Sequence, residues 1–400
     1  MTAQRVRTQV AIVGAGPAGL TLACLLHNAG IESVVLENRS RRYVEERIRA
    51  GVLEQGTVEV LEAAGVGARM HREGIVHHGI YLQFDGERHR IPLSDLADGR
   101  SIVIYGQTEV VKDLIESRLE AGLELRFGVS DVSVHEIESE RPHVRFTHEQ
   151  RHVELECDAI VGADGFHGVC RPAIAERLRV FSREYPFAWL GILSDAPPSV
   201  DELVYAHHER GFALLSLRSS ERTRLYLQVA ADERLEAWPD ERIWEELRRR
   251  VSLDGWTLVE GEVLEKGITP MRSFVAEPMQ HGRLFLAGDS AHIVPPTGAK
   301  GLNLAVSDVA VLADALIESY RSGDRSALAA YSQTCLRRVW RAEHFSYWMT
   351  TMLHRLGDDP FDTQLQRSQL RYIVSSEAAA RTLAENYVGL PVAHRAVTAR

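Results

Sequence analysis

The glycine-rich segment Gly14-Ala15-Gly16-Pro17-Ala18-Gly19 constrains the fold of this chain more than any other stretch of its sequence. It directly follows Thr8–Val13 (TQVAIV), an almost continuous apolar run that predicts a strand buried on both faces. A helical pattern of leucines comes next and ends near Gly30, and a second apolar run, Ser33–Leu36, closes on Glu37. This strand–helix–strand order predicts a parallel sheet with a nucleotide-binding turn.

Each glycine of this segment has its own task in such a turn. Gly14 would allow the tight turn, Gly16 would let the backbone approach a pyrophosphate, and Gly19 would let helix and strand pack closely. Free N–H groups at the start of the helix would attract the phosphates. Glu37 follows the last glycine, Gly19, at close to the usual distance of about 20 residues, and it would accept a hydrogen bond from a ribose hydroxyl. The alternative is an ordinary glycine turn, and the motif alone does not separate FAD from NAD.

Two later segments repeat the pattern of an apolar strand that ends in small residues and an aspartate. Ala159–Gly165 (AIVGADG) contains Asp164, and Leu284–Ser290 (LFLAGDS) contains Asp289. The carboxyl ends of parallel strands are where α/β sheets bind ligands, so these aspartates are candidate binding residues. Each segment by itself is also compatible with an ordinary turn between strand and helix.

Composition and charge exclude several kinds of partner and site. The chain has 400 residues, enough for two or three packed units, and a formal net charge of −10, which disfavours nucleic acid. Its four cysteines lack metal-binding spacing, so we expect reduced thiols, a cytoplasmic protein and no metal site. No apolar run reaches the length of a membrane span, and the run Val10–Val13 is too short for an export signal.

A hairpin is predicted between Phe212–Ser219 (FALLSLRS) and Thr223–Val229 (TRLYLQV), with a polar turn at Glu221 and Arg222. Because side chains alternate along a strand, Ser216 and Arg218 share one face of the first strand. On the second strand, Arg224, Tyr226 and Gln228 share one face and Leu225, Leu227 and Val229 the other. From the residues alone, the favoured interpretation is a sheet with one buried and one solvated face.

The three strand ends, in this order, resemble the group A flavoprotein aromatic hydroxylases. Four further segments strengthen the resemblance, above all to those members that act on 4-hydroxybenzoate, and it covers essentially the whole chain: Arg47–Gly56, Tyr105–Glu109, Pro295–Asn303 and Ala384–Pro391. The resemblance implies an α/β with α+β fold: a Rossmann-like FAD-binding domain interrupted by a mixed-sheet substrate domain, followed by C-terminal helices. The implied divisions are 1–75, 98–181 and 268–320 for FAD, 76–97 and 182–267 for substrate, and 321–400 for a helical interface region. The sequence pattern after Asn303 itself predicts helices at 305–319 and about 328–355.

The resemblance also implies tightly held, non-covalent FAD. Arg49 would meet the pyrophosphate, Gln107 and Asp289 the ribityl chain, and Arg224 the flavin, whose position it would help to control. Backbone N–H groups of Leu302 and Asn303 would face the flavin ring and stabilise its reduced, negatively charged form. The full implied set of cofactor residues is Gly14, Gly16, Gly19, Glu37, Arg47, Arg49, Gln107, Asp164, Arg224, Asp289, Leu302 and Asn303.

The implied reaction is hydroxylation of 4-hydroxybenzoate to 3,4-dihydroxybenzoate with O2 and NADPH (NADH being possible), through a flavin C4a-hydroperoxide shielded from water. Ser216, Arg218 and Tyr226 would bind the substrate carboxylate. Tyr205 and the Pro296 carbonyl would contact the phenol oxygen. Its proton would pass from Tyr205 to Tyr387 and then to His77, a residue type that titrates near neutrality. The adjacent residue, His78, has no part in this scheme and is expected in solvent.

No second glycine motif is present, so the nicotinamide nucleotide is expected in a surface groove. By resemblance its candidate contacts are Tyr43, Arg47, His167, Arg171 and Arg272. The aromatic stripe around Trp340, Phe345 and Trp348 predicts core or a subunit interface, and the resemblance implies a homodimer. The same chemistry on another phenolic acid or an aminobenzoate stays open, as does a non-catalytic FAD-binding protein.

Overall fold

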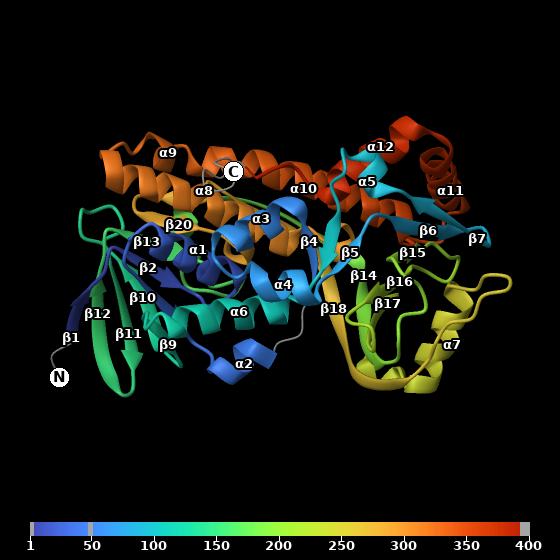
Figure 1. Cartoon of the computed structure of the whole chain (residues 1–400), viewed down its shortest axis with the longest axis horizontal. Helices are drawn as coiled ribbons and strands as arrows, with labels where there is room; N and C mark the ends of the chain where they lie inside the picture. The colour runs from blue at the N-terminus through green and yellow to red at the C-terminus, as the bar shows by residue number, and fades with distance from the viewer. Residues whose placement is uncertain (1–3, 47–50, 393–400) are drawn as a thin grey trace.

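The computed structural model describes residues 4–46 and 51–392, and two large sheets dominate it (Figure 1). The first has six strands, in the order β19 (Gln280–His281), β20 (Leu284–Leu286), β13 (Ala159–Gly162), β2 (Val10–Val13), β3 (Ser33–Glu37) and β9 (Leu125–Phe127). All neighbouring strands pair in parallel except β19, which runs antiparallel to β20. The three predicted strand ends therefore lie side by side, at one edge of one sheet.

The local predictions for the glycine-rich region are confirmed. All four residues of β2 are buried, and α1 (Pro17–Asn28) begins directly after Gly16. Pro17 opens this helix, where its fixed φ and missing N–H carry no penalty. Helix α1 packs against α6 (Gln107–Glu120) and α8 (Gly301–Ser322), which cover the sheet.

The second sheet has eight strands, in the order β21 (His292–Ile293), β18 (Glu262–Glu277), β14 (Arg179–Asp195), β17 (Thr223–Ala230), β16 (Ala213–Leu217), β15 (Val204–Ala206), β6 (Ile80–Phe84) and β7 (Glu87–Ile91). Only β15 and β6 pair in parallel. The predicted hairpin is β16 and β17, which confirms it. The long strands β14 and β18 pair over most of their length.

Both faces of the second sheet are covered, so the solvated face that the residues alone favoured is absent from the described structure. One face carries Leu225, Leu227 and Val229 and packs against α7 (Asp240–Arg250) through Trp244 and Leu247. The other face packs against the C-terminal helices α10 (Tyr331–Leu353), α11 (Pro360–Ser375) and α12 (Glu377–Val388). Figure 1 shows α10 running from beside α8 toward α11 and α12. Strand alternation reveals two faces but not a cover supplied by residues more than a hundred positions later.

The remaining elements are two small sheets and several short helices. One sheet has the order β1 (Gln4–Arg7), β12 (Arg151–Glu156), β11 (His143–His148) and β10 (Ser130–His135), and the other the order β4 (Val52–Glu54), β8 (Ile102–Ile104) and β5 (Ile75–His77). The helices are α2 (Arg41–Glu46), α3 (Gln55–Ala63), α4 (Gly67–Glu73), α5 (Leu93–Leu96) and α9 (Ser326–Ala329), with 3-10 turns η1 (Pro172–Arg177), η2 (Leu235–Ala237), η3 (Gly288–Ser290) and η4 (Pro296–Gly298).

Most of the predicted boundaries fall inside elements, although the one at 97/98 falls between α5 and β8. The division at 181/182 cuts β14, the one at 267/268 cuts β18, and the one at 75/76 cuts β5. Helix α8 extends beyond the predicted 305–319 at both ends, and the predicted helix 328–355 is divided into α9 and α10. Within residues 4–46 and 51–392, no helix is long and apolar enough to cross a membrane. The four cysteines are buried and free, as expected of thiols that form no disulfide.

Candidate active site

The glycine-rich loop is tightly packed at two of its glycines and open at the third. Gly14 has a φ of +109°, and a Cβ there would lie 2.2 Å from the carbonyl oxygen of Ala163. A Cβ on Gly19 would lie 2.1 Å from the carbonyl oxygen of Gly14, so both positions accept only glycine. Gly16 instead faces open space, with no described atom within 4 Å of a built Cβ. The loop is therefore closely packed on one side and accessible on the side where α1 presents its free N–H groups.

Glu37 ends β3 and turns toward this loop. Its carboxylate accepts hydrogen bonds from the backbone N–H of Ala15, at 2.9 Å, and of Arg39, at 2.8 Å. The carboxylate thus lies beside the glycine turn, where a ribose next to the phosphates would come. Because a carboxylate has about four acceptor positions, two of them remain for ribose hydroxyls.

Two other segments meet the glycine turn. A Cβ built on Gly288, just after β20, would lie 3.2 Å from the Cβ of Ala305 and 3.6 Å from that of Ala18. The starts of α1 and α8 and the turn η3 therefore converge. Asp289 is exposed in η3, and Leu302 is half-buried in the first turn of α8. The free N–H groups of that first turn and the Asp289 carboxylate are available to an elongated ligand.

The side chains of two predicted cofactor residues, Asn303 and Asp164, form hydrogen bonds with nearby backbone groups of the protein itself. The Asn303 side chain accepts from the Glu54 N–H and donates to the carbonyls of Val52 and Ala299, so only its backbone N–H is left for a ligand. Asp164 accepts from the N–H groups of Val169 and Cys170 and so holds its own loop. Burial raises the pKa of the Asp164 carboxyl. Gln107 begins α6, whereas Arg47 and Arg49 lie outside the described residues.

A row of paired residues across the second sheet builds the other half of the site. Tyr205 of β15 pairs with Leu214 of β16, Leu214 with Tyr226 of β17, and Tyr226 with Gly191 of β14. Paired residues lie on the same face of a sheet, so all four face the C-terminal helices. A Cβ on Gly191 would lie 2.9 Å from Nη2 of Arg224 and 3.3 Å from Cε1 of Tyr226. Gly191 therefore provides the space that these two side chains occupy.

Two arginines lie beside Tyr226 on this face. The Arg224 guanidinium is 5.5 Å from the Tyr226 ring, and its Nε and Nη1 are buried without a hydrogen-bond partner among the described residues. Ser216 pairs with Arg224 across the hairpin. Arg218 approaches Gly106 so closely that a Cβ there would lie 2.7 Å from its Nη1. Burial lowers the pKa of the Arg218 guanidinium, which is the setting in which an anionic ligand is bound most strongly.

Tyr205 and Tyr387 meet inside the protein. Their hydroxyl oxygens are 2.5 Å apart, and each residue is at most 2% exposed. Burial raises the pKa of both phenols, so both are neutral at physiological pH. Tyr387 is fastened by its own carbonyl, which accepts from Nζ of Lys300 at 2.9 Å. The predicted Pro296 carbonyl already accepts from the Ala299 N–H, which leaves it one further acceptor position.

His77 differs from its expected state. It is fully buried at the end of β5, and neither ring nitrogen has a hydrogen-bond partner in the part of the chain that the structure describes. Burial lowers its pKa to about 4, so the imidazole is neutral at pH 7. The expectation that it titrates near neutrality overlooked this burial. His78 is exposed, as expected, and pairs with Ser94.

Comparison with known proteins places the chain in a family. Residues 7–346 match the family described as "FAD binding domain". The chain belongs to this FAD-binding family. It is 50% identical over 391 residues to a p-hydroxybenzoate hydroxylase of Acinetobacter baylyi (strain ATCC 33305 / BD413 / ADP1), an alignment that covers 97% of this chain and 96% of that protein. It is 24% identical over 375 residues to the FAD-dependent monooxygenase penE of Penicillium thymicola, with coverage of 84% and 75%.

Solved structures show the same fold. The crystal structure of p-nitrophenol 4-monooxygenase PnpA from Pseudomonas putida DLL-E4 superposes with a TM-score of 0.82 at 20% identity, covering 96% of this chain and 99% of that one. The predicted fold class and the resemblance to flavoprotein aromatic hydroxylases are thereby confirmed.

In this FAD-binding protein, most of the candidate nicotinamide residues gather around Phe166. The guanidinium groups of Arg171 and Arg272 lie 4.5 and 5.0 Å from the Phe166 ring, and His167 packs edge-on against it. Arg171 also donates to the carbonyls of Phe166 and Ser290. Tyr43 is on α2 and 46% exposed, with Arg39 over its ring. Arg47 is outside the described residues.

Sequence reasoning missed a buried ion pair beside the site. Nζ of Lys300 lies 2.6 Å from Oε1 of Glu54, and Arg338 reaches the other oxygen of that carboxylate at 3.3 Å. The pair joins the loop before α8 to β4 and, through the Tyr387 carbonyl, to α12. Both residues stand in segments that carried the family resemblance, but nothing in the sequence indicated that they pair.

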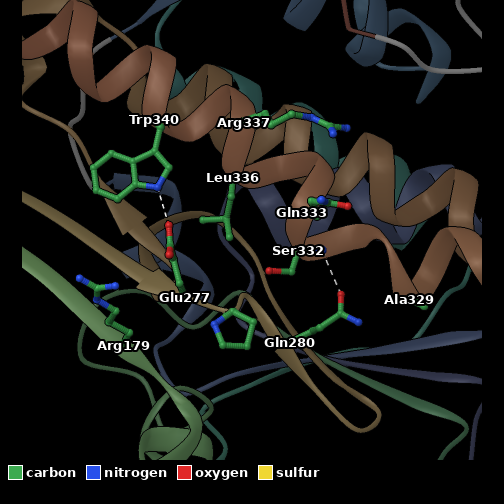
Figure 2. Close-up of a pocket in the computed structure, with 10 residues that line it drawn as sticks. Arg179, Glu277, Gln280, Ala329, Ser332, Gln333, Leu336, Arg337 and Trp340 are labelled. Atoms are coloured by element: carbon green, nitrogen blue, oxygen red, sulfur yellow. Dashed lines mark hydrogen bonds between the residues drawn. The ribbon is translucent and has the colours of Figure 1, made fainter.

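One surface groove lies apart from these groups. It runs between the outer side of α10 and the ends of β14 and β18 (Figure 2) and is lined by Arg179, Glu277, Pro278, Gln280, Ala329, Ser332, Gln333, Leu336, Arg337 and Trp340. Trp340 donates to Glu277 across it, and Gln280 accepts from the Ser332 N–H. Within the described chain, its lining includes none of the predicted site residues.

Proposed function

We propose that this chain hydroxylates 4-hydroxybenzoate next to its hydroxyl group, giving 3,4-dihydroxybenzoate, with FAD as cofactor and O2 and NADPH as co-substrates. The identity of 50% over nearly the whole length of a p-hydroxybenzoate hydroxylase supports the reaction. The single structural observation that carries it is the buried Tyr205–Tyr387 pair on the same sheet face as a pair of arginines.

The two ends of this face suit a para-substituted phenolic acid. Tyr205 and Tyr226 stand two strands apart, so their Cα atoms are separated by roughly 10 Å, with one residue between them. At one end, the Arg218 guanidinium would take the carboxylate, and the hydroxyls of Ser216 and Tyr226 would fill its remaining acceptor positions. At the other end, the Tyr205 hydroxyl would meet the phenol.

The tyrosine pair would take up the phenol proton without placing a free base in the pocket. An ordinary phenol has a pKa of about 10 and is mostly neutral at pH 7, whereas ring hydroxylation needs electron density next to the oxygen. Tyr205 can accept the substrate proton while it donates its own to Tyr387, 2.5 Å away. We propose that His77 then passes the proton on to solvent: its imidazole is neutral because burial lowers its pKa to about 4, so one ring nitrogen can accept a proton while the other releases one.

The described residues fit FAD. Gly16 and the start of α1 would hold the pyrophosphate, Glu37 the adenosine ribose, and Asp289 and Gln107 the ribityl chain. The first turn of α8 would face the flavin ring. The Arg224 guanidinium, whose Nε and Nη1 are buried without a partner among the described residues, would contact the edge of that ring. FAD, when bound, supplies electron transfer from the nicotinamide and the activation of O2. The nicotinamide nucleotide would contact Tyr43, Arg47, His167, Arg171 and Arg272.

We further propose a homodimer formed through the C-terminal helices. Helix α11 exposes Phe361, Leu365 and Tyr372, with 67%, 55% and 60% of each residue accessible. Their spacing places two of them one turn apart on one side of the helix. Large apolar side chains exposed in this way are typical of protein interfaces. Sedimentation of a Phe361→Asp, Leu365→Asp double variant should show monomers, whereas Leu119→Asp, an exposed leucine on α6, should leave dimers intact. A monomeric wild type would contradict the dimer.

The function is tested with purified holoprotein and a panel of substituted benzoates. We expect 4-hydroxybenzoate to stimulate NADPH consumption and to be converted to 3,4-dihydroxybenzoate. The amount of product should nearly equal the amount of NADPH consumed. If an aminobenzoate or another phenolic acid stimulates NADPH consumption more strongly, that acid is the substrate and the proposed type of reaction still holds. Bound flavin without stimulation by any of these acids would indicate a non-catalytic protein.

The proposed contact with the substrate carboxylate is tested by comparing alanine variants of two arginines. Arg218→Ala should weaken 4-hydroxybenzoate binding about 100-fold, since it removes a buried charge partner. Arg222→Ala, in the polar turn of the same hairpin, removes an exposed arginine that pairs with Asp195 and should bind as the wild type does. Unchanged binding in Arg218→Ala would show that the carboxylate is held elsewhere.

A further inference from the structure

Helix α10 carries a line of buried polar residues on the side that faces the site. Glu343, Ser346, Thr350 and His354 follow one another at intervals of three and four residues, the last just beyond the helix end, and each is at most 5% exposed. This spacing puts them on one side of the helix. Buried polar groups are costly unless they are hydrogen-bonded, so such a line needs a reason other than packing.

His354 is fully buried and is surrounded by aromatic rings. Its ring lies 4.6 Å from that of Phe187, at 11°, and 4.3 Å from that of Phe212. An apolar side chain would suit this environment better, because burial of an imidazole brings a desolvation penalty. The residue therefore contributes something that only its ring nitrogens can supply.

The hydrogen bonds fix the tautomer of His354. Nδ1 lies 3.0 Å from the carbonyl oxygen of Thr350, which can only accept, so Nδ1 carries the hydrogen. Nε2 lies 2.6 Å from Nε1 of Trp189, and an indole N–H can only donate, so Nε2 presents a lone pair. Burial lowers the pKa of His354 to about 3, which keeps the ring neutral and Nε2 an acceptor.

Trp189 carries this constraint to the substrate-binding face. It lies on β14 two residues before Gly191, on the same face as Tyr226, and its ring is 4.9 Å from the Tyr226 ring. The indole also stacks against Phe212 at 5.3 Å. Tethering of its N–H fixes the rotation of the indole, and the indole forms the surface on which the Tyr226 ring rests.

The end of α10 is itself held in place from two other sides. The Gln366 amide donates to the carbonyls of His354, at 2.7 Å, and Thr351, at 2.6 Å, while its oxygen faces Nε2 of His207 at 3.2 Å. One turn earlier, the Thr350 hydroxyl donates to that of Thr297, next to Pro296. His354 is thus a fixed point rather than a mobile side chain.

We propose that His354 is a positioning residue for the aromatic substrate: its Nε2 lone pair holds the Trp189 indole, which in turn sets the Tyr226 ring at the carboxylate end of the pocket. This inference rests on the proposed function. It explains why an imidazole occupies an aromatic, water-free environment in which it neither titrates nor touches the substrate.

The test is a double-mutant cycle on the holoprotein, with 4-hydroxybenzoate affinity measured by calorimetry. His354→Phe keeps the aromatic packing but leaves the Trp189 N–H without an acceptor, so we expect about 10-fold weaker binding. Trp189→Phe removes the donor and should weaken binding to a similar degree. Adding His354→Phe to Trp189→Phe should then change affinity less than about 2-fold, because no N–H remains to be satisfied. Trp256→Phe removes an indole hydrogen bond to Ser199 on the other side of the sheet and should leave affinity unchanged.

Two further readouts separate positioning from a general loss of structure. His354→Phe should raise KM with little change in kcat for NADPH oxidation, while the fraction of NADPH that yields product falls. Site-specific replacement of Trp189 by benzothienylalanine, which has sulfur in place of N–H, should reproduce the weaker binding even where His354→Phe does not fold. The positioning role alone would be overturned by wild-type affinity in that analogue. It would also be overturned if His354→Phe lowered 4-hydroxybenzoate affinity by the same factor in the wild type and in Trp189→Phe. Failure of the wild type to bind 4-hydroxybenzoate would overturn the proposed function, and this inference with it.

Discussion

Tyr205 and Tyr387, 182 positions apart in the chain, share a hydrogen bond of 2.5 Å between their hydroxyl groups. One comes from the short strand β15 and the other from the last helix, α12. Both lie in the apolar cluster between the second sheet and the C-terminal helices. A proton could move between them only if each hydroxyl also has a second partner, and in our proposal Tyr205 has the substrate phenol.

Tyr387→Phe should uncouple substrate binding from hydroxylation. The phenyl ring keeps the packing, but the acceptor for the Tyr205 proton is lost, so we expect affinity within about 3-fold and product formation lower by about 100-fold. Tyr320→Phe removes a tyrosine hydroxyl that bonds to Gln9 and Asp158 and serves as control. Wild-type product formation in Tyr387→Phe would remove this residue from the proton path.

Gly16→Ala should separate flavin binding from folding. The added methyl group meets no described atom within 4 Å, so the thermal stability of the apoprotein should be unchanged. It would, however, project toward the proposed pyrophosphate, and FAD affinity measured by flavin fluorescence should fall at least about 10-fold. Gly357→Ala, also with open space around it, should retain FAD. Equal FAD affinity in both variants would place the pyrophosphate elsewhere.

Gly191→Ala should weaken 4-hydroxybenzoate binding about 10-fold, because its methyl group would displace the side chains of Arg224 and Tyr226. Gly267 pairs with Gly191 on the neighbouring strand but has no described atom within 4 Å of a built Cβ. Gly267→Ala is therefore the matched control and should bind as the wild type does. Calorimetric titration with 4-hydroxybenzoate compares the two variants. If Gly191→Ala binds as tightly as Gly267→Ala and the wild type, this face is not the binding site.

Glu343 predicts a pH dependence of stability. Burial raises the pKa of its carboxyl from 4.5 to about 7, with Ser273 and His292 as neighbours that oppose the shift. The folded protein therefore holds this proton more tightly than the unfolded chain. The resulting stabilisation is complete below about pH 4.5 and is lost as the pH rises through 7, a change of about 3 kcal/mol.

Glu343→Gln removes this titration while keeping the shape of the side chain. The variant should gain stability relative to the wild type between pH 5 and pH 8, as measured by the difference in urea midpoint at each pH. A difference that does not vary with pH would show that Glu343 is already ionised at pH 5.

The nucleotide-binding half was predictable because its determinants are local. A strand, a turn whose glycines are required by contacts of 2.2 and 2.1 Å, and a helix occur within a few dozen residues. In the second sheet, strand alternation correctly placed Arg224 and Tyr226 on one face of their strand, and the structure added that Ser216 pairs with Arg224. The pairing of Tyr205 with Tyr387 was expected only from family resemblance. Nothing local indicated that Lys300 meets Glu54 or that Trp189 meets His354.

By itself, the sequence determined the nucleotide turn, the order of the strands along the chain and the alternation of side chains, since each follows from backbone geometry within one segment. Only the tertiary structure decided that both faces of the second sheet are enclosed, and which polar groups of the chain lose their contact with water. His77 illustrates the reason: its type suggested titration near neutrality, but the removal of water lowers its pKa to about 4. Desolvation depends on elements far apart in sequence, and no local pattern records it.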